Sequence, residues 1–266
     1  NTNKHIFITG KAGTGKSALL QYIKRHAKKQ LVVVAPTGIA AINVGGQTIH
    51  SLFKIPPKFI PRNSLRVNSR VASLLRHLDT IIIDEISMVR VDVMDAIDHL
   101  LRQARLKDIP FGGVQIIMFG DLYQLPPVVN SSELHKYFRE NYGGFYFFNA
   151  PAWKQTNMDM YELSHIFRQE DNRFKEILNA IRAGAVNDNL LYELNAKANS
   201  TIPGEGVIIL APTNDLVSYI NKTKLDKLDG KMYQYIADIA GDIKESEFPT
   251  DERLQLKVGA QIMMVK

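Results

Sequence analysis

Short apolar runs alternate with helical patterns along the first half of the chain. The apolar runs are rich in β-branched residues and lie at 5–9, 31–35, 80–84 and 114–119. Patterns with a helical period cover 16–28 and 91–106. Continuous apolar strands separated by helices are typical of a parallel sheet whose two faces are both covered. The pattern therefore predicts an α/β fold.

A weak internal repeat links the two halves of the chain. LVVVAPTGIAAINV at 31–44 is similar to VIILAPTNDLVSYIN at 207–221, and each reads as a strand, then Ala-Pro-Thr, then a helix. Two such units favour two related α/β domains, although strand–turn–helix is also common by chance. The polar stretch at 154–157 suggests a boundary near residues 155–165. We therefore expect a first domain at 1–158 and an incomplete second domain at 159–266.

A phosphate-binding motif follows the first predicted strand. GKAGTGKS at 10–17 satisfies the pattern G-x-x-x-x-G-K-[ST] and opens a helix. Its glycines let backbone N–H groups turn towards phosphate oxygens, and the helix N-terminus adds positive potential. Lys16 is expected to reach the β- and γ-phosphates, and Ser17 to place its hydroxyl on Mg²⁺. The predicted nucleotide-binding residues are Gly10, Ala12, Gly13, Thr14, Gly15, Lys16, Ser17 and Ala18.

Two acids end the strand at 80–84. Asp84 sits at the strand end, where phosphates bind in such sheets, so it is suited to hold Mg²⁺ through water. Glu85 points elsewhere and can deprotonate an attacking water. The alternative is a solvated acidic turn, which the phosphate motif makes less attractive. The pair, with the phosphate motif, indicates nucleoside triphosphate hydrolysis with Lys16 and Glu85 as catalytic residues.

Two other nucleotide-dependent classes fit less well. A small-molecule kinase needs an acceptor site and usually a lid, and has no use for a water-activating glutamate. A GTPase would show Asn-Lys-x-Asp, whereas residues 221–224 read NKTK and lack the final acid.

Composition indicates a compartment and is compatible with a polyanionic partner, although many basic proteins bind nothing acidic. The net charge is +6, the pI is about 9.3, and the chain has no cysteine, which excludes disulfides and thiolate metal sites. No apolar stretch approaches the ~20 residues that span a bilayer. We expect a soluble intracellular protein with no membrane partner.

The basic excess is concentrated in an insertion at 54–77. This segment has six Lys or Arg residues and no acid, so its charge of +6 equals that of the whole chain. The pattern predicts a helix from Asn63 or Ser64, with Arg66 and Arg70 on one face. A solvated helix face is the alternative, but concentration without counter-charge favours phosphate contacts of a nucleic acid.

The remaining motifs resemble a known family. APTGIAA at 35–41, GGQTIHSLF at 45–53, IIIDEISMV at 81–89, PFGGVQIIMFGDLYQLPPV at 110–128 and ELSHIFRQ at 162–169 look like motifs of superfamily-one DNA helicases. The closest likeness is to the RecD-like petite-integration-frequency (PIF) helicases, which DAIDHLLRQARLKDIPFGG at 95–113 also resembles. The motifs occur in the family's order over nearly the whole chain.

The resemblance implies two RecA-like domains and 5′-to-3′ movement on single-stranded DNA. Its implied partners are single-stranded DNA, single-strand/duplex junctions and G-quadruplexes, with ATP and Mg²⁺ as cofactors. It makes the insertion a wedge-like subdomain. We expect a monomer, cytoplasmic in a bacterium and nuclear or mitochondrial in a eukaryote. The implied nucleic-acid contacts are Thr37, Gly38, His50, Phe53, Arg66 and Arg70, and for Phe53 core packing is the stronger alternative.

Two residues are expected to link nucleotide and DNA. Gln124, in FGDLYQLPP at 119–127, can donate and accept hydrogen bonds, so it can contact the γ-phosphate or the attacking water. The resemblance makes it a link to DNA and makes Arg168 an arginine finger on the second domain. The alternative for Arg168 is a surface ion pair with Glu170 or Asp171. Asp121 is expected to hold a neighbouring side chain or backbone amide, and the sequence supports no firmer role for it.

The chain also departs from the family pattern. The adenine-reading glutamine segment upstream of the phosphate motif is missing, and the chain stops at Lys266. We expect a truncated motor that binds nucleotide but hydrolyses it slowly and unwinds poorly alone. The main alternative is an ATP-dependent switch or a non-unwinding subunit of a repair or recombination complex. A nucleic-acid-binding module with a vestigial phosphate motif is a third possibility.

Overall fold

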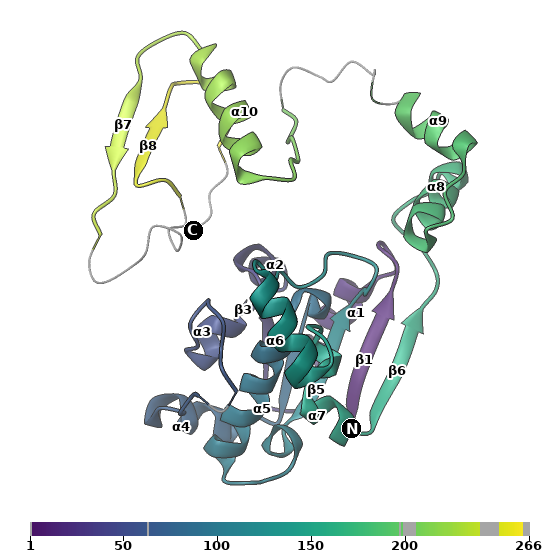
Figure 1. The fold of residues 1–266 in the computed structure, drawn as a ribbon, viewed down its shortest axis with the longest axis vertical. Helices are drawn as coiled ribbons and strands as arrows, with labels where there is room; N and C mark the ends of the chain where they lie inside the picture. Colours follow the sequence, from purple (N-terminus) through teal and green to yellow (C-terminus); the bar gives the residue numbers. More distant parts are fainter. Residues whose placement is uncertain (1, 63, 197, 199–205, 240–249, 263–266) are drawn as a thin grey trace. The chain divides into compact units, whose positions relative to one another are not determined.

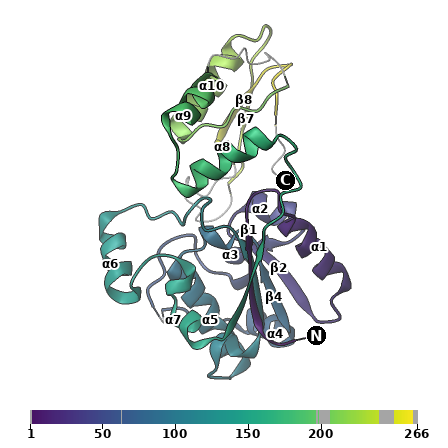
Figure 2. The same ribbon diagram turned by 90° about the vertical axis from the view of Figure 1, so that its right-hand side faces the viewer.

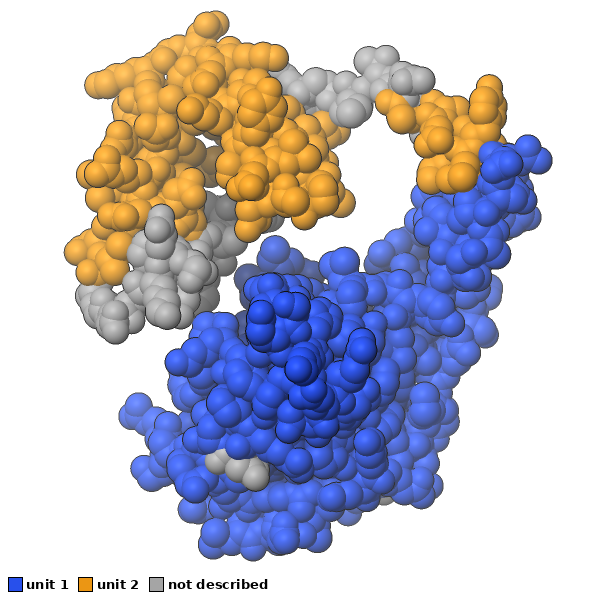
Figure 3. All heavy atoms as spheres, in the orientation of Figure 1, with its two compact units in different colours: residues 1–190 blue, residues 191–266 orange. Residues whose placement is uncertain are grey.

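The computed structural model describes residues 2–62, 64–196, 198, 206–239 and 250–262. It divides into two compact units, Asn1–Leu190 and Leu191–Lys266, coloured separately in Figure 3. The larger unit contains the sheet and the phosphate motif.

Six parallel strands form the central sheet of the larger unit. Their order across the sheet is β3-β2-β4-β5-β1-β6, and every neighbouring pair is parallel. The predicted α/β fold with a parallel sheet is confirmed. The strands are β1 (His5–Gly10), β2 (Leu31–Ala35), β3 (Gln47–Thr48), β4 (Thr80–Ile83), β5 (Gln115–Gly120) and β6 (Met158–Leu163).

The described part of the larger unit contains eight helices of more than one turn and three short 3₁₀ helices, and a further helix, α9 (Asp188–Ala196), runs across its end. The helices are α1 (Lys16–His26), α2 (Gly38–Asn43), α3 (Ile49–Phe53), α4 (Ser69–His77), α5 (Val91–Arg105), α6 (Ser132–Tyr142), α7 (Pro151–Gln155) and α8 (Asn172–Ala183), with η1 (Ile86–Met88), η2 (Pro110–Gly113) and η3 (Phe147–Asn149). None of the helices within the described ranges combines the length and apolar character that a bilayer crossing requires.

The sheet is buried on both faces, as the unbroken apolar strands predict. Because side chains alternate along a strand, Ile82 of β4 packs with Leu20 of α1 on one face. Ile81 and Ile83 pack on the other face with Ile97 and other residues of α5. Figures 1 and 2 show α1 and α5 on opposite sides of the sheet. Because all six strands are parallel, their carboxyl ends lie at one edge of the sheet.

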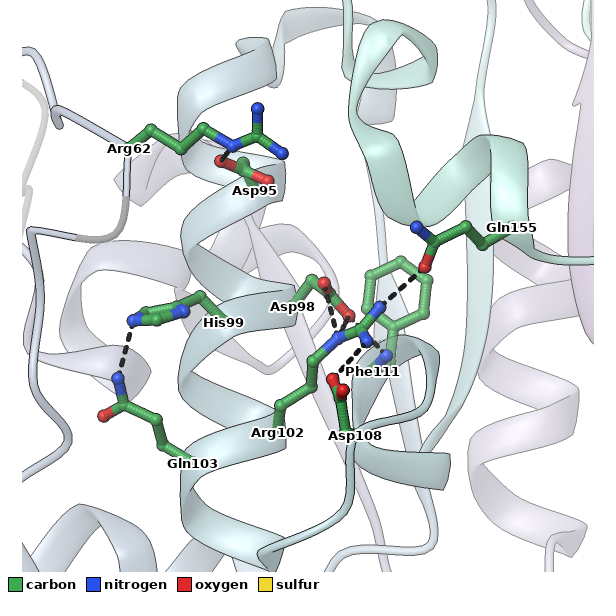
Figure 4. A network of polar contacts seen from close by, with 9 residues as sticks. All are labelled: Arg62, Asp95, Asp98, His99, Arg102, Gln103, Asp108, Phe111 and Gln155. Carbon is green, nitrogen blue, oxygen red and sulfur yellow. Dashed lines mark hydrogen bonds and ion pairs between the residues drawn. The ribbon is translucent and has the colours of Figure 1, made fainter.

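The polar side chains of α5 hold the basic insertion in place. Asp92 accepts a hydrogen bond from the N–H of Ile60 (3.0 Å), and Asp95 pairs with Arg62 (3.7 Å; Figure 4). The amide of Gln103 accepts from the N–H of Val67 (3.0 Å) and donates to the carbonyl of Leu65 (3.3 Å). The insertion is therefore tied to α5 through its backbone at several points.

The predicted helix of the insertion begins later than expected. Helix α4 starts at Ser69, because the side chain of Asn68 caps it by accepting from the N–H of Val71 (2.8 Å). Ser64 lies in irregular structure, and residue 63 is outside the described residues. Arg66 precedes the helix and Arg70 lies inside it. The prediction that these two arginines share a helical face is wrong.

In the segment 95–113, which resembles the PIF helicases, Arg102 joins residues from both ends of the segment. Its guanidinium donates to Asp98 (2.9 Å), Asp108 (2.9 Å) and the side chain of Gln155 (2.9 Å), as Figure 4 shows. Asp98 also accepts from the N–H of Phe111 (2.5 Å). Gly112 turns here with a φ of +58°, and a Cβ at this position would lie 2.6 Å from the carbonyl oxygen of Leu101. These contacts set the direction in which the chain enters β5.

The boundary between the units differs from the one that the sequence suggested. Strand β6 pairs in parallel with β1 over six residues, from His5 opposite Met158 to Gly10 opposite Leu163. Residues 159–163 therefore belong to the first sheet, and the larger unit runs to Leu190.

The described part of the smaller unit contains α10 (Asn214–Asp226) and an antiparallel pair, β7 (Tyr233–Ile236) and β8 (Arg253–Leu256). The helix of the suspected repeat is present. Its strand is not, because residues 207–210 have no strand partner among the residues that the structure describes, and Leu210 is exposed. The expectation of a strand there is wrong, and a second RecA-like domain stays a prediction.

Candidate nucleotide site at the carboxyl edge of the sheet

The phosphate motif forms a tight loop between β1 and α1. Gly13 and Gly15 have φ angles of +79° and +89°, a region that favours glycine. The ammonium of Lys16 donates to the carbonyl oxygens of Gly10 (2.7 Å) and Lys11 (3.1 Å), so it is folded back over the loop. Glycine at the N-cap provides no capping side chain, and α1 has no acid in its first turn. The first N–H groups of the helix are therefore suited to an anion.

The other loop residues divide into two groups. Thr14 is buried, and its hydroxyl donates to the carbonyl of Lys11 (2.8 Å), so this side chain stabilises the loop. Ala12, Ser17 and Ala18 are exposed. Ser17 is thus an exposed residue directly after Lys16, and its role as a Mg²⁺ ligand stays a prediction.

Asp84 and Glu85 follow β4 directly. Asp84 is only 7% exposed, and its N–H donates to the carbonyl of Val34 (2.9 Å) on the neighbouring strand. Burial raises the pKa of Asp84 to about 6, against the opposing effects of the Glu85 N–H and of Lys16. Glu85 has a φ of +50°, an unusual conformation for a residue with a side chain. Such strain is common where a functional side chain must be aimed.

Four charges surround the Lys16 ammonium. Burial lowers the pKa of Lys16, the carboxylates of Asp121, Glu85 and Asp84 oppose this shift, and Arg182 adds to it. These groups come from the ends of β4 and β5, the phosphate loop and α8. The structure thus gathers them at one edge of the sheet, which is where parallel sheets bind ligands.

Strand β5 and the turn after β4 approach each other closely at Gly120. A Cβ on Gly120 would lie 2.7 Å from Cγ2 of Ile86, which is inside any normal contact distance. Glycine is therefore required for the ends of the two strands to sit side by side. This approach brings Asp121 beside the Asp84–Glu85 turn.

Gln124 is exposed and is held by the strand end before it. Its backbone N–H donates to the carbonyl of Asp121 (2.9 Å), and its side-chain amide donates to the Asp121 carboxylate (3.2 Å). The same carboxylate pairs with Arg182 of α8. The expectation that Asp121 holds a neighbouring side chain or backbone amide is confirmed, since it accepts from the Gln124 amide and from the N–H of Tyr123 (3.1 Å). Arg182 was not predicted, because nothing in the pattern of α8 distinguishes it from Arg173, the other arginine of that helix.

Arg168 lies beside the phosphate loop within the larger unit. The N–H of Phe167 donates to the carbonyl of Gly13 (2.8 Å), and a Cβ on Gly13 would lie 2.6 Å from the Cβ of Arg168. The expectation that Arg168 belongs to a separate second domain is therefore wrong, because β6 brings it to the loop. Its role as an arginine finger stays a prediction.

The residues expected to contact DNA differ in their exposure and in their local contacts. Thr37 caps α2 by accepting from the N–H of Ala40 (3.3 Å), and Gly38 is exposed with open space around it. His50 is half-buried. Burial and the nearby Arg90 lower its pKa, so the neutral imidazole is favoured. Phe53 is only 3% exposed and packs in the core, so the expectation that it stacks on a base is corrected.

A metal ion would need oxygen atoms from outside the protein. Within the described residues, no group of three or more His, Cys, Asp or Glu side chains could hold a metal. One hydroxyl, from Ser17, and one carboxylate, from Asp84, nevertheless fit Mg²⁺, which usually takes few protein ligands and completes its shell with water and phosphate oxygens.

Comparison with known proteins decides the family. Residues 1–190 match the family described as PIF1-like helicase. The chain belongs to the PIF1-like helicases. It is 34% identical over 272 residues to human ATP-dependent DNA helicase PIF1, covering 98% of this chain and 41% of that protein. It is 34% identical over 278 residues to the helicase RRM3 of Saccharomyces cerevisiae, covering 98% and 38%.

Solved PIF1-like structures share the fold. Bacteroides Pif1 bound to ssDNA has a TM-score of 0.86 and 40% identity, covering 96% of this chain and 60% of that one. Bacteroides Pif1 in complex with ADP-AlF3 and ssDNA has a TM-score of 0.84 and 40% identity, covering 97% and 61%. The chain thus spans about two fifths of the curated relatives and about three fifths of these structures. The predicted family is confirmed.

Proposed function

We propose that this PIF1-like protein is an ATP-dependent DNA helicase motor. The observation that carries the proposal is the meeting of Lys16, Asp84 and Glu85 at one sheet edge, with Gln124 and Arg168 held against the same loops. The names of the human and yeast relatives support it.

ATP is the nucleotide that the site is proposed to take. The glycine loop and the uncapped start of α1 offer N–H groups to its phosphates, and Lys16 supplies a positive charge beside them. Ser17 and Asp84 would hold Mg²⁺. When bound, Mg²⁺ supplies charge neutralisation on the phosphate oxygens.

Hydrolysis is proposed to proceed by attack of water on the γ-phosphate. The Glu85 carboxylate accepts the proton of that water as the new P–O bond forms and ADP leaves with the bridging oxygen. Gln124 orients the water through its amide. Arg168 and Lys16 stabilise the negative charge that develops on the transferred group.

Single-stranded and forked DNA are the proposed substrates. Bacteroides Pif1 has been solved with ssDNA, and another Pif1 structure, with a TM-score of 0.86, concerns unwinding at forked dsDNA. Movement from 5′ to 3′, action on G-quadruplexes and a monomeric state are further parts of the proposal. The compartment is proposed to follow the host, as cytoplasm in a bacterium and nucleus or mitochondrion in a eukaryote.

ATP turnover by the intact protein, with and without single-stranded DNA, tests this function. The expected result is a rate that rises when DNA is added and that disappears in Lys16→Ala. A rate that ignores DNA would contradict the motor and favour a nucleotide switch. The matched control is Lys28→Ala, because Lys28 is exposed and lies outside the phosphate loop.

A further inference from the structure

Asp121 links three parts of the candidate site. It is only 1% exposed and follows β5 directly. One carboxylate oxygen accepts from the N–H of Tyr123 (3.1 Å). The other accepts from the side-chain amide of Gln124 (3.2 Å) and pairs with Arg182. Within a buried setting, a carboxylate with these partners is fixed in one orientation.

Arg182 comes from the last turn of α8 and is held on two sides. Its side chain is 19% exposed, and its guanidinium carbon lies 4.3 Å from the centre of the Tyr123 ring. A guanidinium can pair with a carboxylate and stack on an aromatic ring at the same time, which an ammonium does less well. Arg182 therefore contacts the segment that carries Gln124 at two residues, Asp121 and Tyr123.

This arrangement also decides which end of the Gln124 amide is engaged. Because its nitrogen donates to Asp121, its carbonyl oxygen is left as the acceptor for another group. An acceptor is what a water molecule needs if it is to be held by one proton while the other is removed. Without Arg182, the Asp121 carboxylate would lose the partner that opposes its rotation.

We propose that Arg182 is a positioning residue that fixes the orientation of Gln124 through Asp121. The inference rests on the proposed ATP hydrolysis and deepens it, because it makes α8 a control element of the same site. Helix α8 lies a few residues before the end of the larger unit at Leu190. A displacement of α8 would reach the Gln124 amide through one ion pair.

The first arm of the test compares Arg182→Gln with Arg173→Gln in the intact protein. Arg173 is the matched control, since it lies on the same helix and pairs locally with Glu176. The expected result is that Arg182→Gln lowers the ssDNA-stimulated rate on the order of tenfold or more, as a misplaced catalytic group does. Its Kd for ATP stays within about twofold of that of Arg173→Gln.

The second arm asks whether Arg182 acts through Gln124. If it does, adding Arg182→Gln to Gln124→Ala causes no further loss of stimulated rate, because the two residues form one coupled chain. Arg182→Lys is expected to recover only part of the rate, since it keeps the charge but loses the planar fork. Losses that multiply in the double variant would overturn the proposal.

A third arm separates the inference from the proposed function. Amide hydrogen exchange at Tyr123 and Gln124 is expected to quicken in Arg182→Gln and to stay unchanged in Arg173→Gln, whatever the protein hydrolyses. If the wild-type protein showed no DNA-stimulated turnover but exchange followed this pattern, the function would fail and the positioning would stand. Unchanged exchange in Arg182→Gln would overturn the positioning itself.

Tyr123→Leu keeps the proposal testable if Arg182→Gln does not fold. Tyr123 is 69% exposed, so its replacement leaves the core intact while removing the ring under the guanidinium. A reduction of the stimulated rate, smaller than for Arg182→Lys, is expected. A wild-type rate in both Tyr123→Leu and Arg182→Lys would overturn the proposal.

Discussion

The backbone N–H of Phe167 donates to the carbonyl oxygen of Gly13 across 2.8 Å, so the segment after β6 is fastened to the phosphate loop. Arg168 follows at once, and its Cβ faces the α-carbon of Gly13. A loop that moves when nucleotide binds would therefore move against this segment directly. The pairing of β6 with β1 within one unit brings Arg168 to the loop. The position of this proposed γ-phosphate contact therefore depends on β6.

Gly13→Ala is predicted to disable the site at this contact. The new Cβ would meet the Cβ of Arg168 at 2.6 Å, and a φ of +79° costs an alanine roughly 1–2 kcal/mol. Either the loop or the Arg168 segment must shift. Stimulated ATP turnover should fall on the order of 10²-fold, measured by phosphate release.

Gly143→Ala is the control for that variant. Gly143 has a similar φ of +81° but nothing within 4 Å of a new Cβ. It should lose a comparable amount of unfolding free energy in urea while keeping its turnover. Equal turnover in the two variants would contradict the role of the Gly13–Arg168 contact.

Glu85→Gln is predicted to separate binding from hydrolysis. The amide keeps the size of the side chain but cannot take a proton, so turnover should fall by on the order of 10²–10⁴. Affinity for ATP should stay close to wild type. Glu140→Gln, an exposed change on α6, provides the comparison, and a turnover loss of less than about threefold in Glu85→Gln would remove Glu85 from the role of base.

His50 predicts a pH dependence of stability. Its pKa is lowered in the folded protein by burial and by Arg90, while Asp92 opposes the shift. The unfolded chain therefore takes up a proton first as pH falls through 6.5, and the folded state loses stability below that point. The unfolding free energy of wild type should fall relative to that of His50→Gln as the pH is lowered from about 7 to 5. Above about pH 7.5, the difference in unfolding free energy between the two proteins should be constant. A difference that stays constant down to pH 5 would contradict this.

The basic insertion predicts a salt effect on DNA binding. Arg66 and Arg70 are both exposed. Arg66 lies in irregular structure before α4, and Arg70 lies within the helix. If each contacts a phosphate, replacing it by alanine should reduce the slope of log K against log[salt] by about 0.7 for single strands. Lys28→Ala is the comparison, and an unchanged slope in both arginine variants would leave the insertion without a phosphate contact.

The sheet and the phosphate loop could be predicted from the sequence because both depend on the pattern of residues that are adjacent along the chain. The unbroken β-branched run at 80–83 marks a strand buried on both faces, and the motif at 10–17 fixes its own turn through glycine. Asp84 then follows from the end of a parallel strand. These inferences need only neighbouring residues, and the structure places all three parts as expected.

Contacts between distant residues could not be predicted in this way. Arg182 lies 61 residues after Asp121, and its pairing depends on how α8 leaves β6. The late start of α4 follows from the Asn68 cap, a local signal, while Gln103 holds the backbone before it at Leu65 and Val67 through contacts that no propensity reveals. Residues 207–210 have strand composition, but a strand also needs a partner.

Strand separation of a forked DNA by the intact protein tests the central claim most directly. We expect a fork with a 5′ single-stranded tail to be opened only when ATP and Mg²⁺ are present, and Glu85→Gln to bind the fork without opening it. A wild-type protein that hydrolyses ATP on such a fork yet never separates its strands would contradict the motor.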